Sequence, residues 1–228
     1  MCGRYTLSKA EQLKEVLREI EEEWLLLPRY NVAPQTRVPV ILDSDPQRLT
    51  SARWGLVPFW SKTETTPFNT INAKAETLHT SACYREAFKR RHCLIPADGF
   101  YEWKKLDAKT KQPFRFVRED EEIFYFAGLW EEWRDPNATP ETPHLRTRTI
   151  ITTTPNELVA PVHNRMPVIL RHEDEARWLA QGLSTDERKA MLAPYAGAMR
   201  TYPVDKRVGA VKNQDAGLID RSDSSNAI

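Results

Sequence analysis

The middle of the chain is a succession of short runs rich in β-branched and aromatic residues, separated by polar and turn-forming residues. Runs of this kind predict β-strands. They are Val38–Leu42, Leu49–Val57, His92–Pro96, Gly99–Lys104, Pro113–Val117, Ile123–Trp133, Thr147–Thr154 and Met166–Leu170. We therefore expect strands to dominate the centre of the sequence.

Helical periodicity is limited to the two ends of the chain. Ser8 and Glu11 have the spacing of a capping box, and apolar residues then recur at helical spacing. These apolar residues are Leu13, Val16, Leu17, Ile20 and Trp24. The pattern predicts an amphipathic helix over roughly residues 9–24. Near the other end, Glu173–Ala180 predicts one helix, and the capping box from Ser184 to Glu187 opens another over roughly 185–193.

No internal repeat and no long linker divides the sequence. Asp135–Pro143 contains three prolines and predicts a solvent loop between two strands. The polar stretch Asp220–Ile228 predicts a disordered tail. We therefore predict a single α+β domain over residues 1–228, with a barrel-like, mostly antiparallel curved sheet and peripheral helices.

Composition narrows the class of protein. The chain has 228 residues, enough to bury a substantial core. It contains no apolar run of about 18 residues and no basic-then-apolar start, so we expect neither a membrane span nor a signal peptide. Its three cysteines, Cys2, Cys83 and Cys93, indicate a reducing, cytoplasmic environment. Cysteine and histidine spacings match no metal motif, so we expect no metal site.

Charge is balanced overall but uneven along the chain. The net charge of +1 argues against a uniformly basic nucleic-acid binder. Between Tyr84 and Arg118, ten Lys and Arg residues stand against four Asp and Glu, and the acidic run Glu119–Glu122 follows. This distribution favours either one basic face suited to local phosphate contact or an ordinary solvated surface.

The start of the chain, Met1-Cys2-Gly3-Arg4, carries the most distinctive chemistry. Removal of Met1 gives Cys2 a free α-amine beside its thiol, and the ordinary pKa values of these groups are about 7.7–8.0 and about 8.5. Both are therefore partly deprotonated near neutral pH. Such an aminothiol condenses with an aldehyde to an imine, and its thiol then closes a thiazolidine ring. The alternative is an incidental thiol at a frayed terminus.

Glu102 is a candidate general acid or base. It lies between Tyr101 and Trp103, and on a strand it would share one face with Phe100 and Lys104. Apolar rings around a carboxylate disfavour its charged form and raise its pKa. The alternative is an exposed glutamate on an edge strand.

Other polar and aromatic residues have two interpretations each. His163 is either an ordinary loop histidine or a catalytic group, and Asn72 either caps a turn or belongs to a site. Trp54, Phe59 and Trp60 offer stacking surfaces for unpaired bases, although aromatic residues more often pack in a core. We expect only one of the three to be exposed.

Six segments together, in order and spacing, resemble the SRAP family (SOS response-associated peptidase). The resemblance runs from Cys2 to about Ile219, nearly the whole chain. The segments are Met1-Cys2-Gly3-Arg4-Tyr5, Tyr30-Asn31-Val32-Ala33-Pro34, Trp54-Gly55-Leu56, Asn72-Ala73-Lys74-Ala75-Glu76-Thr77, Asp98-Gly99-Phe100-Tyr101-Glu102-Trp103 and His163-Asn164-Arg165-Met166-Pro167.

The resemblance implies a protein that recognises abasic sites in single-stranded DNA, with or without a junction to duplex, and links itself to them covalently. It also implies self-processing that removes Met1. Cys2 would be the nucleophile, and Asn72, Glu102 and His163 would complete the catalytic site. By the same resemblance Arg4, Lys74 and Arg165 would contact DNA. We expect Trp60 and Arg85 to bind DNA as well.

At one position this chain departs from the family pattern. The family commonly has arginine where this chain has Lys74. Lysine keeps the charge but lacks the planar fork that grips a phosphate with two hydrogen bonds. We therefore expect weaker DNA affinity and unchanged chemistry.

In the expected mechanism, Glu102 opens the abasic sugar by proton transfer, the Cys2 amine forms an imine, and the thiol closes the ring. His163 carries protons, and Asn72 holds the amine or a sugar hydroxyl. No cofactor is required. The imine also allows elimination of the 3′ phosphate, which predicts weak lyase activity. We expect a monomer, associated with the nucleoid if the source is bacterial.

Two other functions share part of this pattern. An N-terminal-nucleophile cysteine hydrolase would use Cys2 against an amide, with its own α-amine as the base. A non-catalytic reader of single-stranded DNA would bind equally well without Cys2. A stable protein–DNA adduct distinguishes the predicted function from both.

Overall fold

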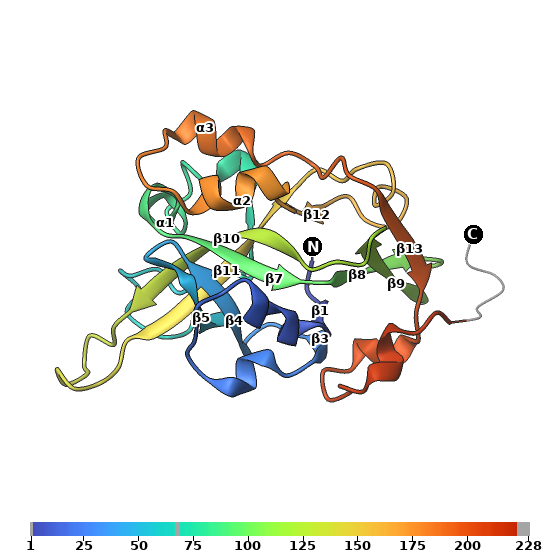
Figure 1. Ribbon diagram of the computed structural model, residues 1–228, viewed down its shortest axis with the longest axis horizontal. Helices are drawn as coiled ribbons and strands as arrows, with labels where there is room; N and C mark the ends of the chain where they lie inside the picture. Colours follow the sequence, from blue (N-terminus) through green and yellow to red (C-terminus); the bar gives the residue numbers. More distant parts are fainter. Residues whose placement is uncertain (1, 67–68, 223–228) are drawn as a thin grey trace.

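The computed structural model describes residues 2–66 and 69–222, which form two curved sheets with short helices around them (Figure 1). The strands are β1 (Tyr5–Leu7), β2 (Glu19–Ile20), β3 (Arg29–Val32), β4 (Arg37–Leu42), β5 (Asp45–Trp54), β6 (Asn72–Lys74), β7 (His92–Ala97), β8 (Gly99–Lys105), β9 (Lys111–Arg118), β10 (Phe124–Trp133), β11 (Leu145–Thr153), β12 (Met166–Pro167) and β13 (Met199–Pro203). The α-helices are α1 (Arg85–Arg90), α2 (His172–Leu179) and α3 (Thr185–Ala190). The 3-10 helices are η1 (Ala10–Glu15), η2 (Glu23–Leu26), η3 (Ala75–Thr77), η4 (Lys206–Gly209) and η5 (Ala216–Ile219).

Five strands close into a barrel. Antiparallel pairs join them in the order β11-β10-β7-β4-β5, and β5 then pairs in parallel with β11 through Arg53 with Thr147 and Trp54 with Arg148. Side chains fill the interior, as expected for a barrel of this size. The predicted α+β class with a barrel-like, mostly antiparallel sheet is therefore confirmed.

A second sheet, in the order β13-β9-β8-β1-β3, lies beside the barrel. The chain passes between them at Asp98, which separates β7 from β8. The backbone there is crowded, because a Cβ on Gly99 would stand 2.8 Å from Arg115 Nε and 2.9 Å from Thr6 Oγ1. β1 is an interior strand, with β3 on one side and β8 on the other.

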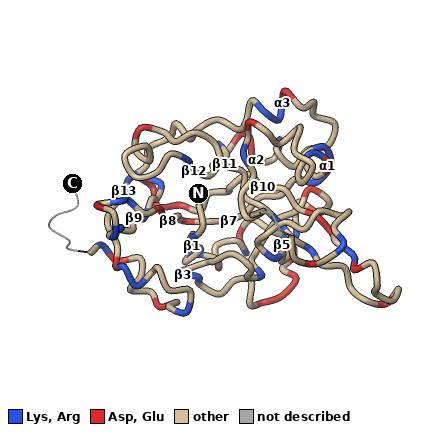
Figure 2. Tube along the Cα trace, turned by 180° about the vertical axis from the view of Figure 1, so that it is seen from behind, with Lys and Arg blue, Asp and Glu red and all other residues tan. Residues whose placement is uncertain are grey.

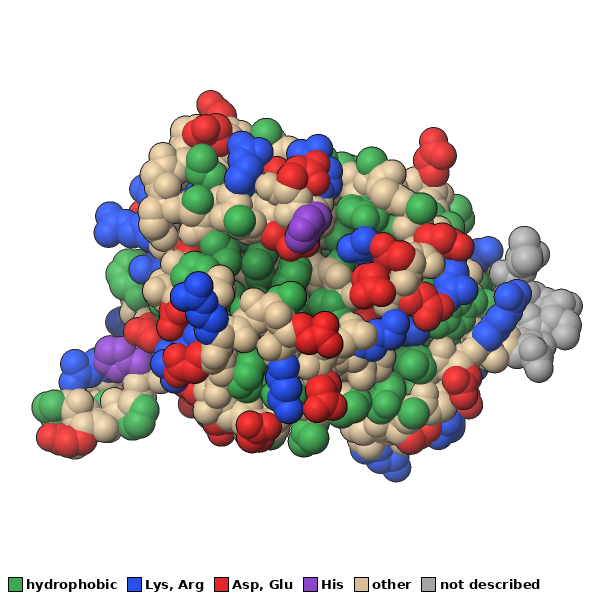
Figure 3. All heavy atoms as spheres, viewed as in Figure 1, with side chains coloured by type: hydrophobic (Ala, Val, Ile, Leu, Met, Phe, Trp, Pro, Cys, Tyr) green, Lys and Arg blue, Asp and Glu red, His purple; other side chains and the backbone are tan. Residues whose placement is uncertain are grey.

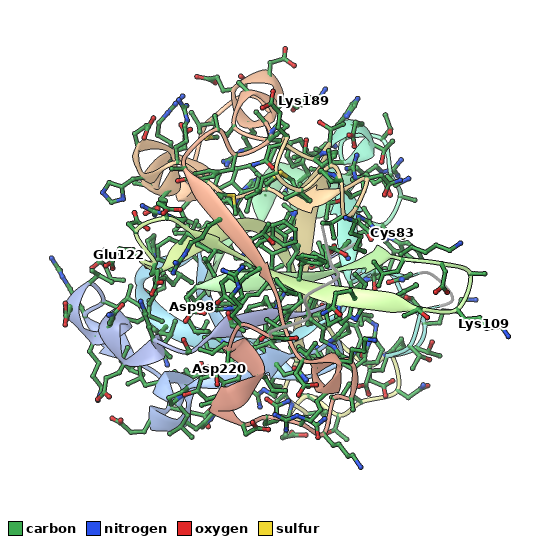
Figure 4. All side chains as sticks on the ribbon, turned by 90° about the vertical axis from the view of Figure 1, so that its right-hand side faces the viewer. Cys83, Asp98, Lys109, Glu122, Lys189 and Asp220 are labelled. Carbon is green, nitrogen blue, oxygen red and sulfur yellow. The ribbon has the colours of Figure 1, made fainter. Side chains whose placement is uncertain are left out.

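Asp98 fastens the start of the chain to this crossing, and Figure 4 labels it beside the second sheet. Its carboxylate accepts hydrogen bonds from Thr6 Oγ1, from the Ser8 amide and hydroxyl, and from the Lys9 amide at 2.9 Å. Arg115 Nη2 also donates to it at 3.1 Å. Because both charges are buried, this network fixes residues 6–9 firmly.

The eight predicted strands are present with small shifts of their ends, and so are the two predicted C-terminal helices. The capping box of Ser184 and Glu187 forms as predicted. Met166–Leu170 is shorter than predicted, because pairing continues beyond Pro167 only as a bridge from Ile169 to Phe126. The loop over Asp135–Pro143 is confirmed.

The predicted helix over 9–24 is wrong. Two short 3-10 helices occupy this stretch, and β2 interrupts them by pairing in parallel with β5. Ser8 makes no capping bond, since its hydroxyl and amide are both turned to Asp98. Tertiary hydrogen bonds have therefore overridden a helical periodicity.

At the C-terminal end, the predicted disorder over Asp220–Ile228 is wrong for its first residues. Arg221 forms a β-bridge with Val204, and the Ser222 amide donates to Pro203 O at 2.9 Å. Residues 223–228 lie outside the described residues. Among the helices described, none is long and apolar enough to cross a membrane.

Of the two interpretations of the basic segment, one basic face or an ordinary solvated surface, the fold favours the second. The segment from Tyr84 to Arg118 is divided between α1 and β7 near the barrel and β8 and β9 in the second sheet, and Lys109 projects at the tip of the β8–β9 hairpin (Figure 4). Several of its cations also have acidic partners. Figure 2 shows basic and acidic segments interleaved along the trace. The cations with partners are Arg85, Lys89, Arg91, Arg115 and Arg118.

Candidate active site

Cys2 is completely buried, with 0% of its surface exposed. It precedes β1, whose hydrogen bonds to both neighbouring strands hold the start of the chain inside the fold. The Tyr101 amide donates to Arg4 O at 3.0 Å, which continues this pairing back toward Cys2. The frayed terminus considered from sequence is therefore excluded.

Asn72 holds the backbone of Cys2. Its Nδ2 donates to Cys2 O at 2.9 Å, and its own carbonyl accepts a bond from Tyr84 Oη at 3.1 Å. Asn72 lies on β6, which pairs in parallel with β11 opposite Ile150. Within the described structure, Asn72 Oδ1 is buried with no hydrogen-bond donor. Such an acceptor costs about 1–3 kcal/mol and is available to a ligand.

Glu102 is buried on β8, with 3% of its surface exposed. Because β8 lies between β1 and β9, the edge-strand alternative is wrong. Burial raises the pKa of Glu102 from its usual 4.5 to about 7. This carboxyl can therefore give or take a proton near neutral pH.

His163 completes the cluster from a loop before β12. Its Nε2 lies 4.0 Å from Glu102 Oε2. Its Nδ1 lies 3.0 Å from the Arg165 amide nitrogen and 3.1 Å from Arg165 O, so the ring is held against its own loop while Nε2 faces Glu102. Burial lowers the pKa of His163. The neutral ring is therefore favoured near neutral pH.

These contacts bring together all four residues predicted to be catalytic. Asn72 contacts Cys2, and His163 faces Glu102. Burial, together with the neighbouring Glu102 carboxylate, raises the pKa of the Cys2 thiol. The cluster thus combines a buried thiol and a buried acid–base carboxyl with a partly exposed imidazole.

Arg4, predicted to bind DNA, is engaged within the protein. Its Nη1 donates to Val208 O at 2.7 Å and to Asn31 Oδ1 at 3.1 Å, and its Nη2 donates to Gly209 O at 3.3 Å. Partial burial lowers its pKa. Arg4 therefore ties the start of the chain to η4, a role that its charge alone did not indicate.

Arg165 and Lys74 lie at the edge of the cluster, and Glu76 is a partner of Arg165 there. Arg165 forms a two-point ion pair with Glu76 at 2.6 and 3.0 Å, and also donates to Thr152 O at 2.6 Å. Lys74 is exposed at the end of β6, opposite Thr152 on β11. Glu76, absent from the predicted site, sets the position of the Arg165 guanidinium.

The aromatic residues divide differently from prediction. Trp54 is fully buried, whereas Phe59 and Trp60 are 53% and 49% exposed, so two of the three are accessible instead of one. Trp60 Nε1 donates to Ala82 O at 3.3 Å, which places its ring near the start of α1. Arg85, the first residue of α1, is also exposed there.

No group of His, Cys, Asp and Glu within residues 2–66 and 69–222 could hold a metal ion. A cleft lies elsewhere, over η1, the start of β10 and α2, where Figure 3 shows a hollow with hydrophobic side chains at its floor. None of the predicted site residues lines it.

Comparison with known proteins gives consistent matches. The SOS response associated peptidase (SRAP) family model matches residues 1–211. The abasic site processing protein YoqW of Bacillus subtilis (strain 168) is 42% identical, over 96% of this chain and 99% of that protein. The abasic site processing protein YedK of Escherichia coli (strain K12) is 30% identical, over 96% of this chain and 99% of that protein.

A vertebrate relative and a solved structure extend the likeness. The abasic site processing protein HMCES of Gallus gallus is 32% identical, over 93% of this chain and 75% of that protein. An X-ray crystal structure of a protein from Bacteroides thetaiotaomicron superposes with a TM-score of 0.86 at 28% identity. The superposition covers 97% of this chain and 100% of that chain.

Proposed function

Because the chain belongs to the SOS response associated peptidase (SRAP) family, we propose that it processes abasic sites in single-stranded DNA by linking itself to them through Cys2. The observation that carries the proposal is the cluster of Cys2, Asn72, Glu102 and His163. Relatives named abasic site processing proteins support the choice of DNA lesion. Repair of damaged DNA and a place in the SOS response follow from the same family.

The reaction begins with the abasic sugar, whose ring must open to expose an aldehyde. Glu102, with its pKa raised to about 7, transfers a proton to the ring oxygen and takes the proton of the anomeric hydroxyl as the ring opens to the aldehyde. The Cys2 amine then adds to the aldehyde carbon, and the carbinolamine loses water to give an imine. His163, which faces Glu102, accepts the proton that the amine loses on addition and donates a proton to the hydroxyl that leaves as water.

Ring closure makes the link durable. The Cys2 thiol adds to the imine carbon, its proton passes to the imine nitrogen, and a thiazolidine forms without oxidant or metal. Asn72 Oδ1, buried and lacking a donor in the part of the chain described, accepts a hydrogen bond from the amine or a sugar hydroxyl. Holding amine, thiol and aldehyde together replaces a bimolecular encounter, an effect worth up to about 7–11 kcal/mol. Before closure, the imine allows elimination of the 3′ phosphate, the source of weak lyase activity.

The reaction requires that Met1 be removed, because an amide nitrogen does not form an imine. We assign this removal to peptidase activity of the same site. The Cys2 thiol attacks the carbonyl carbon of Met1, and the amide C–N bond breaks to leave a thioester and the free Cys2 amine. Water then hydrolyses the thioester, which releases methionine and regenerates the thiol. The family description, SOS response associated peptidase, supports this assignment. Incubating the full-length chain and its Cys2→Ala variant with no other protein, and following Met1 by mass spectrometry, tests it. Equal loss of Met1 from both would refute self-processing.

DNA would reach the cluster across its exposed rim. Lys74 and Arg85 are exposed cations, and Trp60 offers a ring for stacking an unpaired base. Arg165 would also bind DNA when a phosphate displaces Glu76 from its guanidinium. Arg4 would support DNA binding indirectly, because its bond to Val208 O holds β1 in place.

The deciding experiment incubates the mature chain with single-stranded oligonucleotides that differ only in one abasic site. We expect a heat-stable band on a denaturing gel with the abasic oligonucleotide alone. Cys2→Ala should abolish that band while non-covalent binding to intact DNA survives, because phosphate contacts remain. A normal heat-stable adduct with Cys2→Ala would refute the mechanism. Binding of DNA without any adduct would favour a non-catalytic reader. Turnover of peptides, with no adduct, would favour a hydrolase.

A further inference from the structure

Arg148 is a charged residue inside the barrel. It lies on β11 opposite Trp130 on β10 and Trp54 on β5, and 0% of its surface is exposed. Its guanidinium stacks 4.5 Å from the ring centre of Trp54 and 5.4 Å from that of Tyr5. Its Nη2 donates to Tyr5 Oη at 2.8 Å.

This cation has no carboxylate partner among the described residues, and its Nε and Nη1 are buried without hydrogen-bond acceptors. Burying an uncompensated charge is unfavourable, and stacking on aromatic rings offsets only part of that cost. The two other arginines buried within residues 2–66 and 69–222 are compensated. Arg115 pairs with Asp98, and Arg188 donates to the carbonyls of Trp178 and Ala180 at 2.7 Å each.

Arg148 is directed to the same interior as Cys2. Tyr5, which accepts its hydrogen bond, is three residues after Cys2 in the sequence, and both pack in one buried cluster. Asn72, which holds Cys2 O, pairs with Ile150, two residues from Arg148 on β11. Burial and the Glu102 carboxylate raise the pKa of the Cys2 thiol, and the positive charge of Arg148 acts in the opposite direction and lowers it.

We propose that Arg148 is a positioning residue whose buried charge keeps the amine of Cys2 neutral and favours ionisation of its thiol, so that both are ready to attack an aldehyde. A cation disfavours a nearby ammonium and favours a nearby thiolate, so one charge assists both nucleophiles. The protons released pass to solvent, and no bond to Arg148 forms or breaks. The inference rests on the proposed function of Cys2, but its test uses no DNA.

Other ionisable groups face this interior and must be held constant in the test. They are Glu102 from β8, Tyr5 from β1, Cys93 from β7, Arg29 from β3 and His163 from the loop before β12. A substitution at Arg148 leaves all of them in place, so a change in pH dependence reports the guanidinium charge.

The experiment measures how fast formaldehyde, a small aldehyde, converts Cys2 of the mature chain to a thiazolidine as the pH is varied. Mass spectrometry of the N-terminal peptide detects the gain of formaldehyde less one water. We expect Arg148→Met to move the midpoint of the rate profile to higher pH by about one unit, the lower end of effects from a near charge. Arg148→Lys, which keeps the charge, should restore the midpoint.

Arg188→Met is the matched control, because Arg188 is also buried over a tryptophan, Trp178, but its guanidinium is satisfied by carbonyl groups. It should leave the midpoint unchanged even if it lowers stability. An unshifted midpoint in folded Arg148→Met, or an equal shift in Arg188→Met, would overturn the proposal. Should Arg148→Met not fold, Arg148→Gln supplies the neutral variant, and an unshifted midpoint there overturns it equally.

The result separates this inference from the function proposed above. If the formaldehyde midpoint shifts while no variant links to abasic DNA, the role of Arg148 stands and the DNA reaction fails. If DNA linkage occurs and the midpoint does not shift, the DNA reaction stands and the proposed role of Arg148 is wrong.

Discussion

Replacing Glu102 by glutamine should make the protein more stable at alkaline pH and much slower in its reaction. Burial raises the pKa of Glu102 from 4.5 to about 7 in the folded protein. The folded state therefore binds this proton more tightly than the unfolded state, and stability falls as pH rises from about 4.5 to about 7. Above that range the loss is complete. The difference corresponds to about 3 kcal/mol for the ionised, buried carboxylate.

Glutamine keeps the size and polarity of Glu102 but does not ionise, so the variant escapes this loss. Urea unfolding of both proteins should show that the stability of Glu102→Gln relative to the parent rises by about 2–3 kcal/mol between about pH 5 and about pH 8. Taking the difference between the two proteins cancels the titration of other groups.

The same substitution should slow formation of the abasic adduct by the roughly 10²–10⁴-fold typical of a lost general acid or base. A quenched time course on denaturing gels measures this rate. If the stability difference does not vary with pH, Glu102 does not titrate as argued. If the rate is unchanged, Glu102 is a structural residue and the proposed mechanism is wrong.

Three further substitutions test the surroundings of the cluster. Lys74→Arg should tighten non-covalent binding to intact single-stranded DNA by about 1 kcal/mol, because it restores a two-point phosphate contact. Fluorescence anisotropy measures this, and weaker binding with an intact fold would contradict the transfer of a DNA-binding role to that position. Glu76→Gln removes the carboxylate that occupies Arg165, so affinity should rise and the salt dependence should steepen by about 0.7 in slope. A loss of affinity in a salt titration would instead mean that Glu76 holds Arg165 in its DNA-binding position. Asp98→Asn leaves the buried Arg115 without its counter-charge and should cost about 3–5 kcal/mol in urea unfolding. A cost below about 1 kcal/mol would show that β1 is held by its strand pairing alone.

The barrel was predictable because most of its strands are short runs of residues with high β-propensity. β4 is rich in β-branched side chains and β10 in aromatic ones, each over a run of strand length. β6 was not predictable, since Asn72-Ala73-Lys74 has no strand pattern and is extended only because it pairs with β11. The same limit explains the false helix over 9–24, where pairing of β2 with β5 decides the backbone.

For the site, the sequence indicated chemistry more reliably than geometry. Cys2, Asn72, Glu102 and His163 could be named as reactive types, and the resemblance grouped them. Their burial could not be read from the chain, because it depends on strands far apart in sequence. Arg148 and Glu76 look like ordinary charged residues in the sequence. Arg148 is distinguished by having no carboxylate partner among the described residues, and Glu76 by its two hydrogen bonds to Arg165.

The interior position of β1 has a consequence for the order of events during synthesis. β1 leaves the ribosome before its neighbours β3 and β8, which end at Val32 and Lys105. At about 5–20 residues per second, roughly 5 to 20 s pass before β8 can close over Cys2. Throughout that interval the start of the chain is open to any processing enzyme, and afterwards it is enclosed. An external aminopeptidase would therefore have to act on the nascent chain, whereas self-processing would begin only once the fold is complete, and pulse-labelled nascent chains would separate the two in time.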